Sequence, residues 1–266
     1  MAANRRADSP RSSEWRDAVR LARSAFRVMI ETDLAANLAR VQEQIAEAAL
    51  RAGRRPEDVT LVGVSKTHSP EAVFAAVHAG LRDVGENRVQ EAASKVPIVR
   101  RLLAERGTRN AEPPVWHLVG HLQTNKVNAS LELFDAIDSV DSLHLAEAIS
   151  KRLRGRSLPV LLEVYVGTDP DRPGLRPEQV EETAGRILGL PGLVVQGLMT
   201  VPPLGEDPRP AFRQVAQVRN RLTATYRAVH FDVLSMGMSE DFLIAIEEGS
   251  TQVRIGTAIF GPRGSQ

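Results

Sequence analysis

The chain has 266 residues, 42% of them hydrophobic, which suits one large α/β barrel or two smaller domains. Its 34 basic and 33 acidic residues leave a formal net charge of +1, so the charge gives no indication of a nucleic-acid partner. The absence of cysteine excludes disulfides, cysteine nucleophiles and thiolate metal sites, and no apolar run approaches the roughly 20 residues of a membrane span.

Residues 1–30 differ in composition from the rest of the chain. Met1–Arg11 is polar and arginine-rich, which predicts disorder, whereas apolar residues recur at helical spacing from Trp15 to Met29. An arginine-rich amphipathic start is also typical of organelle-targeting peptides, but interspersed acidic residues argue against that interpretation. We therefore expect an N-terminal extension with an accessory helix, followed by the working domain over residues 31–266.

From residue 31 onward, helical and strand-like patterns alternate. The first helix carries the apolar stripe from Leu34 to Ala49, with Thr32 or Asp33 as its N-cap and Gly53 at its end. Eight apolar runs are predicted as strands: Val59–Val64, Leu81–Gly85, Val115–Gly120, Ala136–Val140, Val160–Val166, Val194–Met199, Phe231–Ser235 and Val253–Gly256. Seven stretches that separate these strands are predicted as helices: Pro70–Ala79, Glu86–Arg106, Asn125–Leu133, Leu143–Leu153, Pro177–Leu190, Pro210–Val229 and Ser239–Glu247.

This alternation predicts a parallel sheet, and eight strands are the number that closes a (β/α)8 TIM barrel. Several strands are continuously apolar, as expected when both faces of a sheet are covered. A doubly wound open sheet is the competing arrangement, but no glycine fingerprint follows the first strand. In a barrel the active site lies at the carboxyl ends of the strands, where this sequence gathers polar residues and glycines.

Lys66 follows the first predicted strand and is one of only four lysines in the chain. A buried lysine can become a neutral amine that forms a Schiff base with a carbonyl, although Lys66 considered alone fits a snorkelling side chain better. Ser239 and Gly256-Thr257 follow strands 7 and 8, where barrel enzymes commonly bind phosphate; the alternatives are a helix cap and a tight turn. Together these features favour a site for a phosphorylated aldehyde.

His117 and His121 are four residues apart, a spacing that forms a metal pair on a helix. The segment around His117 has a strand pattern, and no cysteine or neighbouring carboxylate in the sequence completes a ligand set. We interpret both histidines as polar residues at a strand end and expect no metal site.

Six segments occur in the order of a known motif series. The chain resembles the pyridoxal phosphate homeostasis proteins of the YggS/PROSC type, and the match extends from about Asp33 to Gly261. The segments that carry the resemblance are Val64–Thr67, Gly85–Glu91, Trp116–Lys126, Gly197–Pro202, Leu234–Asp241 and Val253–Gly261. The resemblance implies a barrel like the N-terminal domain of alanine racemase, without the second β-domain of that enzyme.

The resemblance also implies a cofactor, pyridoxal 5′-phosphate, and a set of residues that bind it. Lys66 would form the internal aldimine, Asn87 would flank the cofactor ring and Arg254 would approach the pyridine nitrogen. The phosphate would be held by Ser239, Gly256 and Thr257.

Two features depart from the pattern of this family. Tyr165 stands where an asparagine is usual, and Arg172-Pro173 stands in a loop that usually carries a lysine. The extension before Met29, where a typical member begins, is also longer than usual. The departures at Tyr165 and Arg172-Pro173 affect the rim after the fifth strand and leave the predicted cofactor residues intact.

The expected place of Arg254 limits the chemistry. An arginine beside the pyridine nitrogen disfavours a protonated ring and so supports carbanion formation only weakly. A racemase needs a second base, usually a tyrosine from another domain, and this chain has only Tyr165 and Tyr226.

We therefore expect a protein of intracellular pyridoxal phosphate homeostasis that holds the cofactor with little or no turnover. We expect it to be a cytoplasmic monomer that serves apo-forms of pyridoxal phosphate enzymes and binds neither membranes nor nucleic acids. The alternatives are a pyridoxal phosphate-dependent amino-acid racemase and a cofactor-free Schiff-base aldolase.

Overall fold

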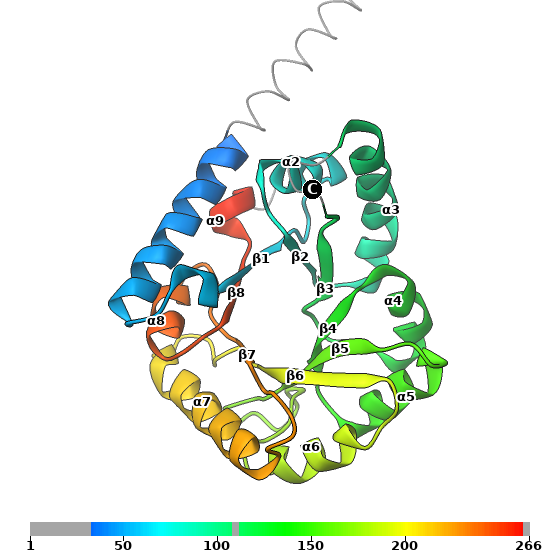
Figure 1. Ribbon diagram of the computed structural model, residues 1–266, viewed down its shortest axis with the longest axis vertical. Helices are drawn as coiled ribbons and strands as arrows, with labels where there is room; N and C mark the ends of the chain where they lie inside the picture. The colour runs from blue at the N-terminus through cyan, green and yellow to red at the C-terminus, as the bar shows by residue number, and fades with distance from the viewer. Residues whose placement is uncertain (1–32, 108–111, 263–266) are drawn as a thin grey trace, which may run out of the picture.

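A computed structural model describes residues 33–107 and 112–262 (Figure 1). The extension predicted over residues 1–30, with its Trp15–Met29 stripe, lies outside the described residues. Eight parallel strands form a closed barrel in chain order, and the last strand pairs back with the first. The predicted TIM barrel is therefore confirmed. No helix of the described part of the chain is long and apolar enough to cross a membrane.

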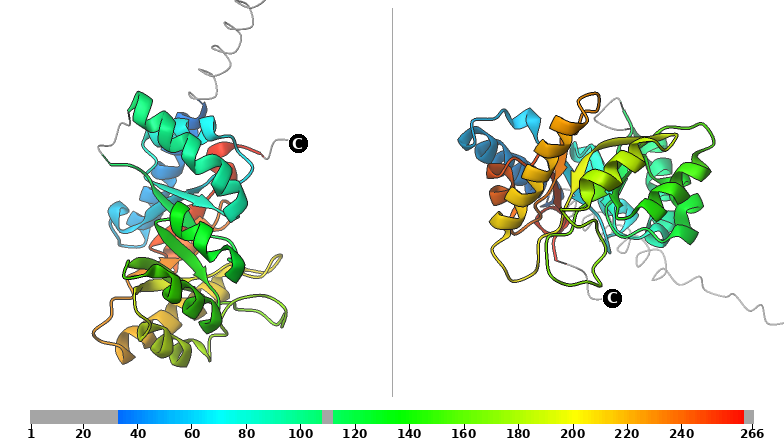
Figure 2. Two further views of the ribbon diagram at one scale, coloured as in Figure 1. Left: turned by 90° about the vertical axis from the view of Figure 1, so that its right-hand side faces the viewer. Right: turned by 90° about the horizontal axis from the view of Figure 1, so that it is seen from below.

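The strands lie close to their predicted positions: β4 coincides with its prediction, and the others differ by at most three residues at either end. Their bounds are β1 Thr60–Val64, β2 Asp83–Glu86, β3 Val115–Leu118, β4 Ala136–Val140, β5 Leu158–Glu163, β6 Leu193–Met199, β7 Val233–Ser235 and β8 Gln252–Ile255. Because all eight are parallel, their carboxyl ends meet at one face of the barrel. Figure 2 shows the loops after β5 and β6 projecting from the same side of the molecule.

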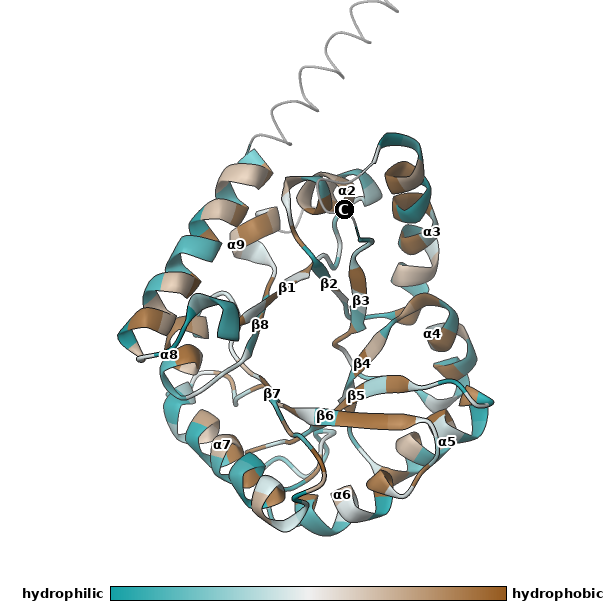
Figure 3. Cartoon of the chain, in the orientation of Figure 1, coloured by the Kyte–Doolittle hydropathy of each residue, from teal (hydrophilic) through white to brown (hydrophobic). Residues whose placement is uncertain are grey.

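Helices surround the barrel and turn their apolar faces towards it (Figure 3). Their bounds are α2 Pro70–Ala79, α3 Val89–Arg106, α4 Val127–Leu133, α5 Leu143–Leu153, α6 Val180–Leu188, α7 Pro208–Thr225, α8 Phe242–Glu247 and α9 Thr257–Phe260. Two short 3-10 helices are also present, η1 Pro56–Asp58 and η2 Thr124–Lys126.

The helix over residues 33–51 precedes the barrel and carries the predicted stripe. All six stripe residues are buried: Leu34, Leu38, Val41, Ile45, Ala48 and Ala49. Gly53 follows with a φ of 69°, a left-handed conformation that glycine adopts without steric cost, and so ends the helix as predicted. Asp33 is already helical, so it is not the N-cap, and Thr32 lies outside the described residues.

Two differences from the predicted helices lie next to the barrel mouth. The helix predicted to start at Ser239 starts at Phe242, because the Asp241 carboxylate accepts the Met238 N–H at 2.5 Å and forms a side-chain turn there. Ser239 therefore lies in the loop and does not cap the helix. The one-turn helix α9 begins at Thr257, where no helix was predicted.

The barrel interior is more polar than the apolar strand runs suggest. Every residue of β4 is buried, including Asp138 and Ser139, and β8 contributes the buried Gln252 and Arg254. Side chains alternate along each strand, so Asp138, Gln252 and Arg254 point into the barrel, whereas Ser139, next to Asp138, bonds to the Gly120 carbonyl oxygen instead. Inside a barrel, buried polar groups must be satisfied by one another, and this requirement organises the site described next.

Candidate functional site

A cavity of about 660 Å³ opens at the carboxyl ends of the strands, a size typical of small-molecule sites. The loop between β6 and α7 forms one wall, from Val201 to Pro208. All six residues predicted from the sequence line this one cavity: Lys66, Asn87, Ser239, Arg254, Gly256 and Thr257. The structure therefore brings together residues that are up to 191 positions apart in the chain.

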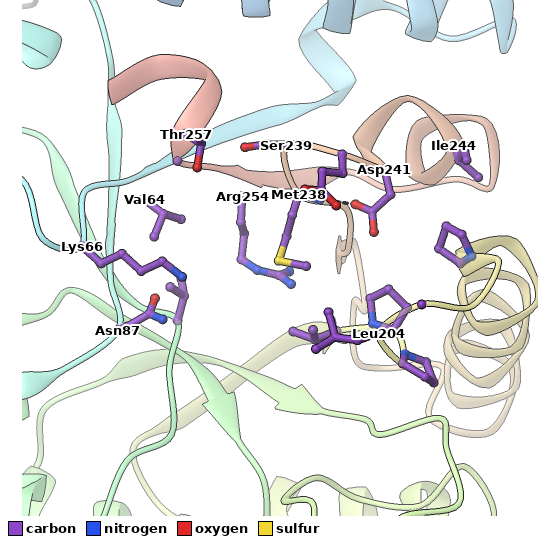
Figure 4. A pocket seen from close by; sticks show the side chains of 18 of the residues that line it. Val64, Lys66, Asn87, Leu204, Met238, Ser239, Asp241, Ile244, Arg254 and Thr257 are labelled. Carbon is purple, nitrogen blue, oxygen red and sulfur yellow. Dashed lines mark hydrogen bonds between the residues drawn. The ribbon is translucent and has the colours of Figure 1, made fainter. Parts of the chain in front are cut away.

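Lys66 and Asn87 enter the cavity from the ends of β1 and β2. Figure 4 shows the Lys66 amine beside Asn87, with Arg254 and Met238 further along the cavity. Lys66 is half-buried, between the buried Ser65 and the exposed Thr67. Thr67 has a φ of 67°, which is rare for a β-branched residue and marks a strained turn directly after the lysine.

Ser239, Gly256 and Thr257 occupy the β7–β8 side of the cavity. Figure 4 labels Ser239 and Thr257, which both line the cavity on that side. A Cβ atom at Gly256 would lie 3.0 Å from the Val64 carbonyl oxygen, so glycine lets β8 pass close to the end of β1. Two hydroxyls and a close-approaching backbone are groups that can bind phosphate oxygens.

Arg254 is buried in the floor of the cavity. Its guanidinium donates to Ser235 Oγ at 2.7 Å and to the Thr200 carbonyl oxygen at 2.8 Å. Burial lowers the pKa of Arg254, and the nearby carboxylates Asp138, Glu163 and Asp241 oppose this shift. Two of the five guanidinium N–H groups are used in these bonds, so the side chain is held in place and can still donate to a ligand.

A chain of hydrogen bonds continues from Arg254 through the barrel interior. Gln252 Nε2 donates to Ser235 Oγ at 2.9 Å and to Asp138 Oδ2 at 2.7 Å. Asp138 Oδ1 in turn lies 3.2 Å from His117 Nδ1. The cavity floor is thus connected to a buried histidine on the opposite half of the barrel.

His117 corrects an interpretation made from the sequence. It lies within β3, and two carboxylates from neighbouring strands flank it: Asp138 at 3.2 Å and Asp83, 3.1 Å from Nε2. Burial lowers the pKa of His117, but the two carboxylates outweigh burial and raise it to about 10. The residue is therefore a buried cation held by two anions. Within the described residues no group of three or more metal-ligating side chains is placed to hold a metal.

A second buried cluster, which the sequence analysis did not identify as functional, lies directly behind Lys66. Lys95 Nζ donates to the Ser65 carbonyl oxygen at 2.7 Å and to the carboxylates of Glu86 at 2.6 Å and Glu91 at 2.9 Å. The available signals were the i, i+4 spacing of Glu91 and Lys95 and the scarcity of lysine in the chain. Neither signal says that the pair packs against the end of β1.

Neither tyrosine of the chain lines the cavity. Tyr226 donates its hydroxyl to the Glu181 carbonyl oxygen at 2.9 Å, outside the barrel. Tyr165 is buried beneath Arg172 and Arg176, whose guanidinium carbons lie 5.6 Å and 4.6 Å from the ring centroid. The two departures noted after the fifth strand are therefore packed against each other, and they stabilise the β5 loop through a cation–π contact.

The donors of the cavity fit a ligand with an aldehyde and a phosphate. An amine, a guanidinium, an amide and two hydroxyls converge there. Three carboxylates also line the wall, at Glu206, Glu240 and Asp241, and Asp241 is turned to the Met238 N–H (Figure 4). An electrophile can meet the Lys66 amine while an anion binds the hydroxyl side, which is the arrangement that pyridoxal phosphate requires.

Comparisons with known proteins give a consistent result. The family described as "Alanine racemase, N-terminal domain" matches residues 36–264. A pyridoxal phosphate homeostasis protein of Aquifex aeolicus is 42% identical over 231 residues, which cover 85% of this chain and 96% of the relative. The protein of the same description in Escherichia coli K12 is 38% identical over 239 residues, or 87% of this chain and 97% of the relative.

A solved structure extends the comparison to three dimensions. PipY of Synechococcus elongatus, whose structure is described as having pyridoxal phosphate bound, is 36% identical, with a TM-score of 0.68 and coverage of 82% of this chain and 100% of PipY.

Proposed function

This chain belongs to the alanine racemase N-terminal domain family and, within it, to the pyridoxal phosphate homeostasis proteins, and on that premise we propose that it binds pyridoxal 5′-phosphate in the cavity that Lys66 enters. One observation carries the proposal: an amine and two phosphate-binding hydroxyls, predicted separately from the sequence, line one cavity of suitable size. The bound cofactor would supply an aldehyde, an electrophile for a neutral amine.

Each of the six residues has a proposed role. Lys66 Nζ adds to the aldehyde carbon, and the carbonyl oxygen leaves as water. Asn87 flanks the ring, and Arg254 donates towards the pyridine nitrogen from its fixed place in the floor. The phosphate is held by Ser239, Gly256 and Thr257.

We propose that the protein holds and releases the cofactor and does not turn over amino acids efficiently. The buried Arg254 favours an unprotonated ring nitrogen, because a second positive charge beside a guanidinium is repelled. In addition, neither tyrosine lines the cavity, so the second base used by racemases has no tyrosine candidate there. A racemase and a cofactor-free aldolase are the less favoured alternatives, and both share the Lys66 chemistry.

The wider role follows from the family. We propose that the protein works in the cytoplasm as a monomer and exchanges pyridoxal phosphate with apo-forms of enzymes that use it. We also propose that residues 31–266 form the functional unit and that residues 1–30 are accessory.

An absorption spectrum of the purified protein with and without added pyridoxal phosphate tests the binding site. Wild type should show a visible band that disappears on borohydride reduction, and peptide mapping should then find the label on Lys66. Lys66→Ala should lose the band, whereas Lys151→Ala, which changes an exposed lysine, should keep it. Label on Lys95 or Lys126 would show that the attachment site is wrong, and a colourless protein labelled only with an aldehyde substrate would favour the aldolase.

A further inference from the structure

The cluster behind Lys66 is unusual because it buries an ammonium group in the interface between α3 and the strand ends. The Lys95 side chain is only 4% exposed and the Glu86 side chain is fully buried. Burying such charges costs several kcal/mol per ion, so a cluster of this kind needs close pairing to be tolerated. The hydrogen bonds of the cluster show which groups its charges are paired with.

The cluster contacts the backbone on both sides of Lys66. On one side, Lys95 Nζ donates to the carbonyl oxygen of Ser65 at 2.7 Å. On the other side, Glu91 Oε1 accepts the backbone N–H of Thr67 at 2.5 Å. The same Glu91 oxygen lies 2.9 Å from Lys95 Nζ, so one ion pair of α3 holds the residues before and after the lysine.

The Thr67 contact stabilises a conformation that threonine avoids. A φ of 67° places its Cβ against its own backbone, and this conformation persists only when the surroundings enforce it. The charged acceptor on Thr67 N–H is such a constraint. Because Thr67 follows Lys66 directly, loss of the left-handed turn would change the direction of the chain at the lysine and move its amine.

Glu86 completes the cluster from the end of β2. Its Oε1 accepts from Lys95 Nζ at 2.6 Å and from Ser65 Oγ at 2.5 Å, while its Oε2 has no hydrogen-bond partner among the described residues. Burial raises the pKa of Glu86, although the Lys95 ammonium and the Ser65 hydroxyl act in the opposite direction and lower it. Glu86 thus fixes the Ser65 side chain and the Lys95 ammonium at once. It also precedes Asn87, which lines the cavity.

We propose that Glu91 and Lys95 of α3 are positioning residues that hold Lys66 in the orientation in which its amine meets the aldehyde of the ligand. The proposal rests on the function proposed above. Neither residue lines the cavity, so both act through the backbone on either side of Lys66.

Two ligands separate positioning from general stability. Pyridoxal phosphate can bond to Lys66, whereas 4′-deoxypyridoxine 5′-phosphate has the same ring and phosphate but no aldehyde. In Glu91→Ala the affinity for pyridoxal phosphate and the rate at which the visible band forms should both fall about tenfold, the effect of one hydrogen bond. The affinity for the deoxy analogue should stay within about twofold of wild type, because its contacts do not depend on the Lys66 turn.

Three further variants complete the test. Glu105→Ala breaks an exposed ion pair with Arg101 on the same helix and should behave as wild type. Lys95→Met should show the same losses of affinity and rate as Glu91→Ala. If Lys95→Met does not fold, Glu91→Ala alone is enough to test the proposal. Thr67→Gly added to Glu91→Ala should restore much of the rate, because glycine adopts the left-handed turn without the carboxylate.

The outcomes are distinguishable. The proposal is overturned if Glu91→Ala binds pyridoxal phosphate as wild type does, or if it loses both ligands equally, which would indicate a purely structural role. If wild type binds neither ligand, the proposed function itself fails.

Discussion

His117 and Asp138 face each other inside the barrel, with Nδ1 of the histidine 3.2 Å from Oδ1 of the aspartate. This contact is the far end of the hydrogen-bond chain that reaches Arg254 in the cavity floor. A buried imidazole between two carboxylates is stable as a cation, because its charge is compensated by the buried Asp138 and by Asp83, whose side chain is 22% exposed. The pair therefore links the stability of the barrel interior to pH.

The pH dependence of folding is the first prediction. The pKa of His117 is raised from 6.5 to about 10 in the folded protein, so its contribution is fully present below about pH 6.5 and is lost as pH rises through 10. The stability advantage of wild type over His117→Gln should shrink between pH 6 and pH 10, at up to about 1.4 kcal/mol per pH unit. Urea unfolding of both proteins across this range measures it. A constant difference would contradict a charged His117.

Gly120 should be intolerant of a side chain because it touches the backbone of a cavity residue. A Cβ at this position would lie 2.4 Å from the Asn87 carbonyl oxygen and 2.9 Å from its Cα. Gly120→Ala should displace Asn87, destabilise the protein by about 1–3 kcal/mol and weaken cofactor binding. At Gly189 the nearest atom to such a Cβ is 3.5 Å away, so Gly189→Ala is the matched control and should be nearly neutral. Equal melting temperatures for the two variants would refute the argument.

Thr257 offers a direct test of the phosphate side. Thr257→Val removes a hydroxyl and keeps the shape, so it should weaken pyridoxal phosphate binding by about 1.5–3 kcal/mol, the value of a charge-assisted hydrogen bond. Pyridoxal, which lacks the phosphate, should bind wild type and variant alike. Fluorescence titration with both ligands measures this. If both affinities fall equally, Thr257 supports the barrel and the phosphate binds elsewhere.

The loss of stability on replacing Arg254 should depend strongly on the charge of the new side chain. Arg254→Gln removes the bonds to Ser235 and Thr200 but leaves a neutral side chain. Arg254→Glu would add a fourth carboxylate to a buried region that already holds Asp138, Glu163 and Asp241. Arg254→Glu should therefore have a free energy of unfolding about 3–5 kcal/mol lower than that of Arg254→Gln. Thermal unfolding of both variants provides the comparison, and similar melting temperatures would show that the three carboxylates do not act on this position.

The N-terminal extension should be dispensable. A chain that begins at Met29 should keep the melting temperature and cofactor content of the full protein, because the family match begins at residue 36. Calorimetry and the visible spectrum together test this. A large loss of either would show that residues before Met29 contribute to the working domain.

The sequence alone determined the barrel and the set of residues around its mouth. Strand and helix periods are local properties, and parallel strands in a barrel direct their carboxyl ends to one face, so Lys66, Ser239 and Thr257 could be assigned to one site before any contact was known. Asn87 and Arg254 were added to that site by the resemblance to the pyridoxal phosphate homeostasis proteins. The start of α8 was placed three residues too early because Ser239 is a good cap in isolation. The competing bond between Asp241 and Met238 is a matter of local geometry that residue preference does not reveal.

Only the tertiary structure decided how these residues are held. Gln252 and Asp138 are 114 residues apart, and Lys95 and Ser65 are 30 apart, yet each pair shares a buried hydrogen bond. Such contacts depend on barrel closure and on the angle at which α3 packs, which no local pattern encodes. These contacts cannot be predicted from local sequence because a buried polar group is satisfied by whichever polar group the fold brings next to it. The sequence therefore identified the amine of Lys66, and the fold determined what positions it.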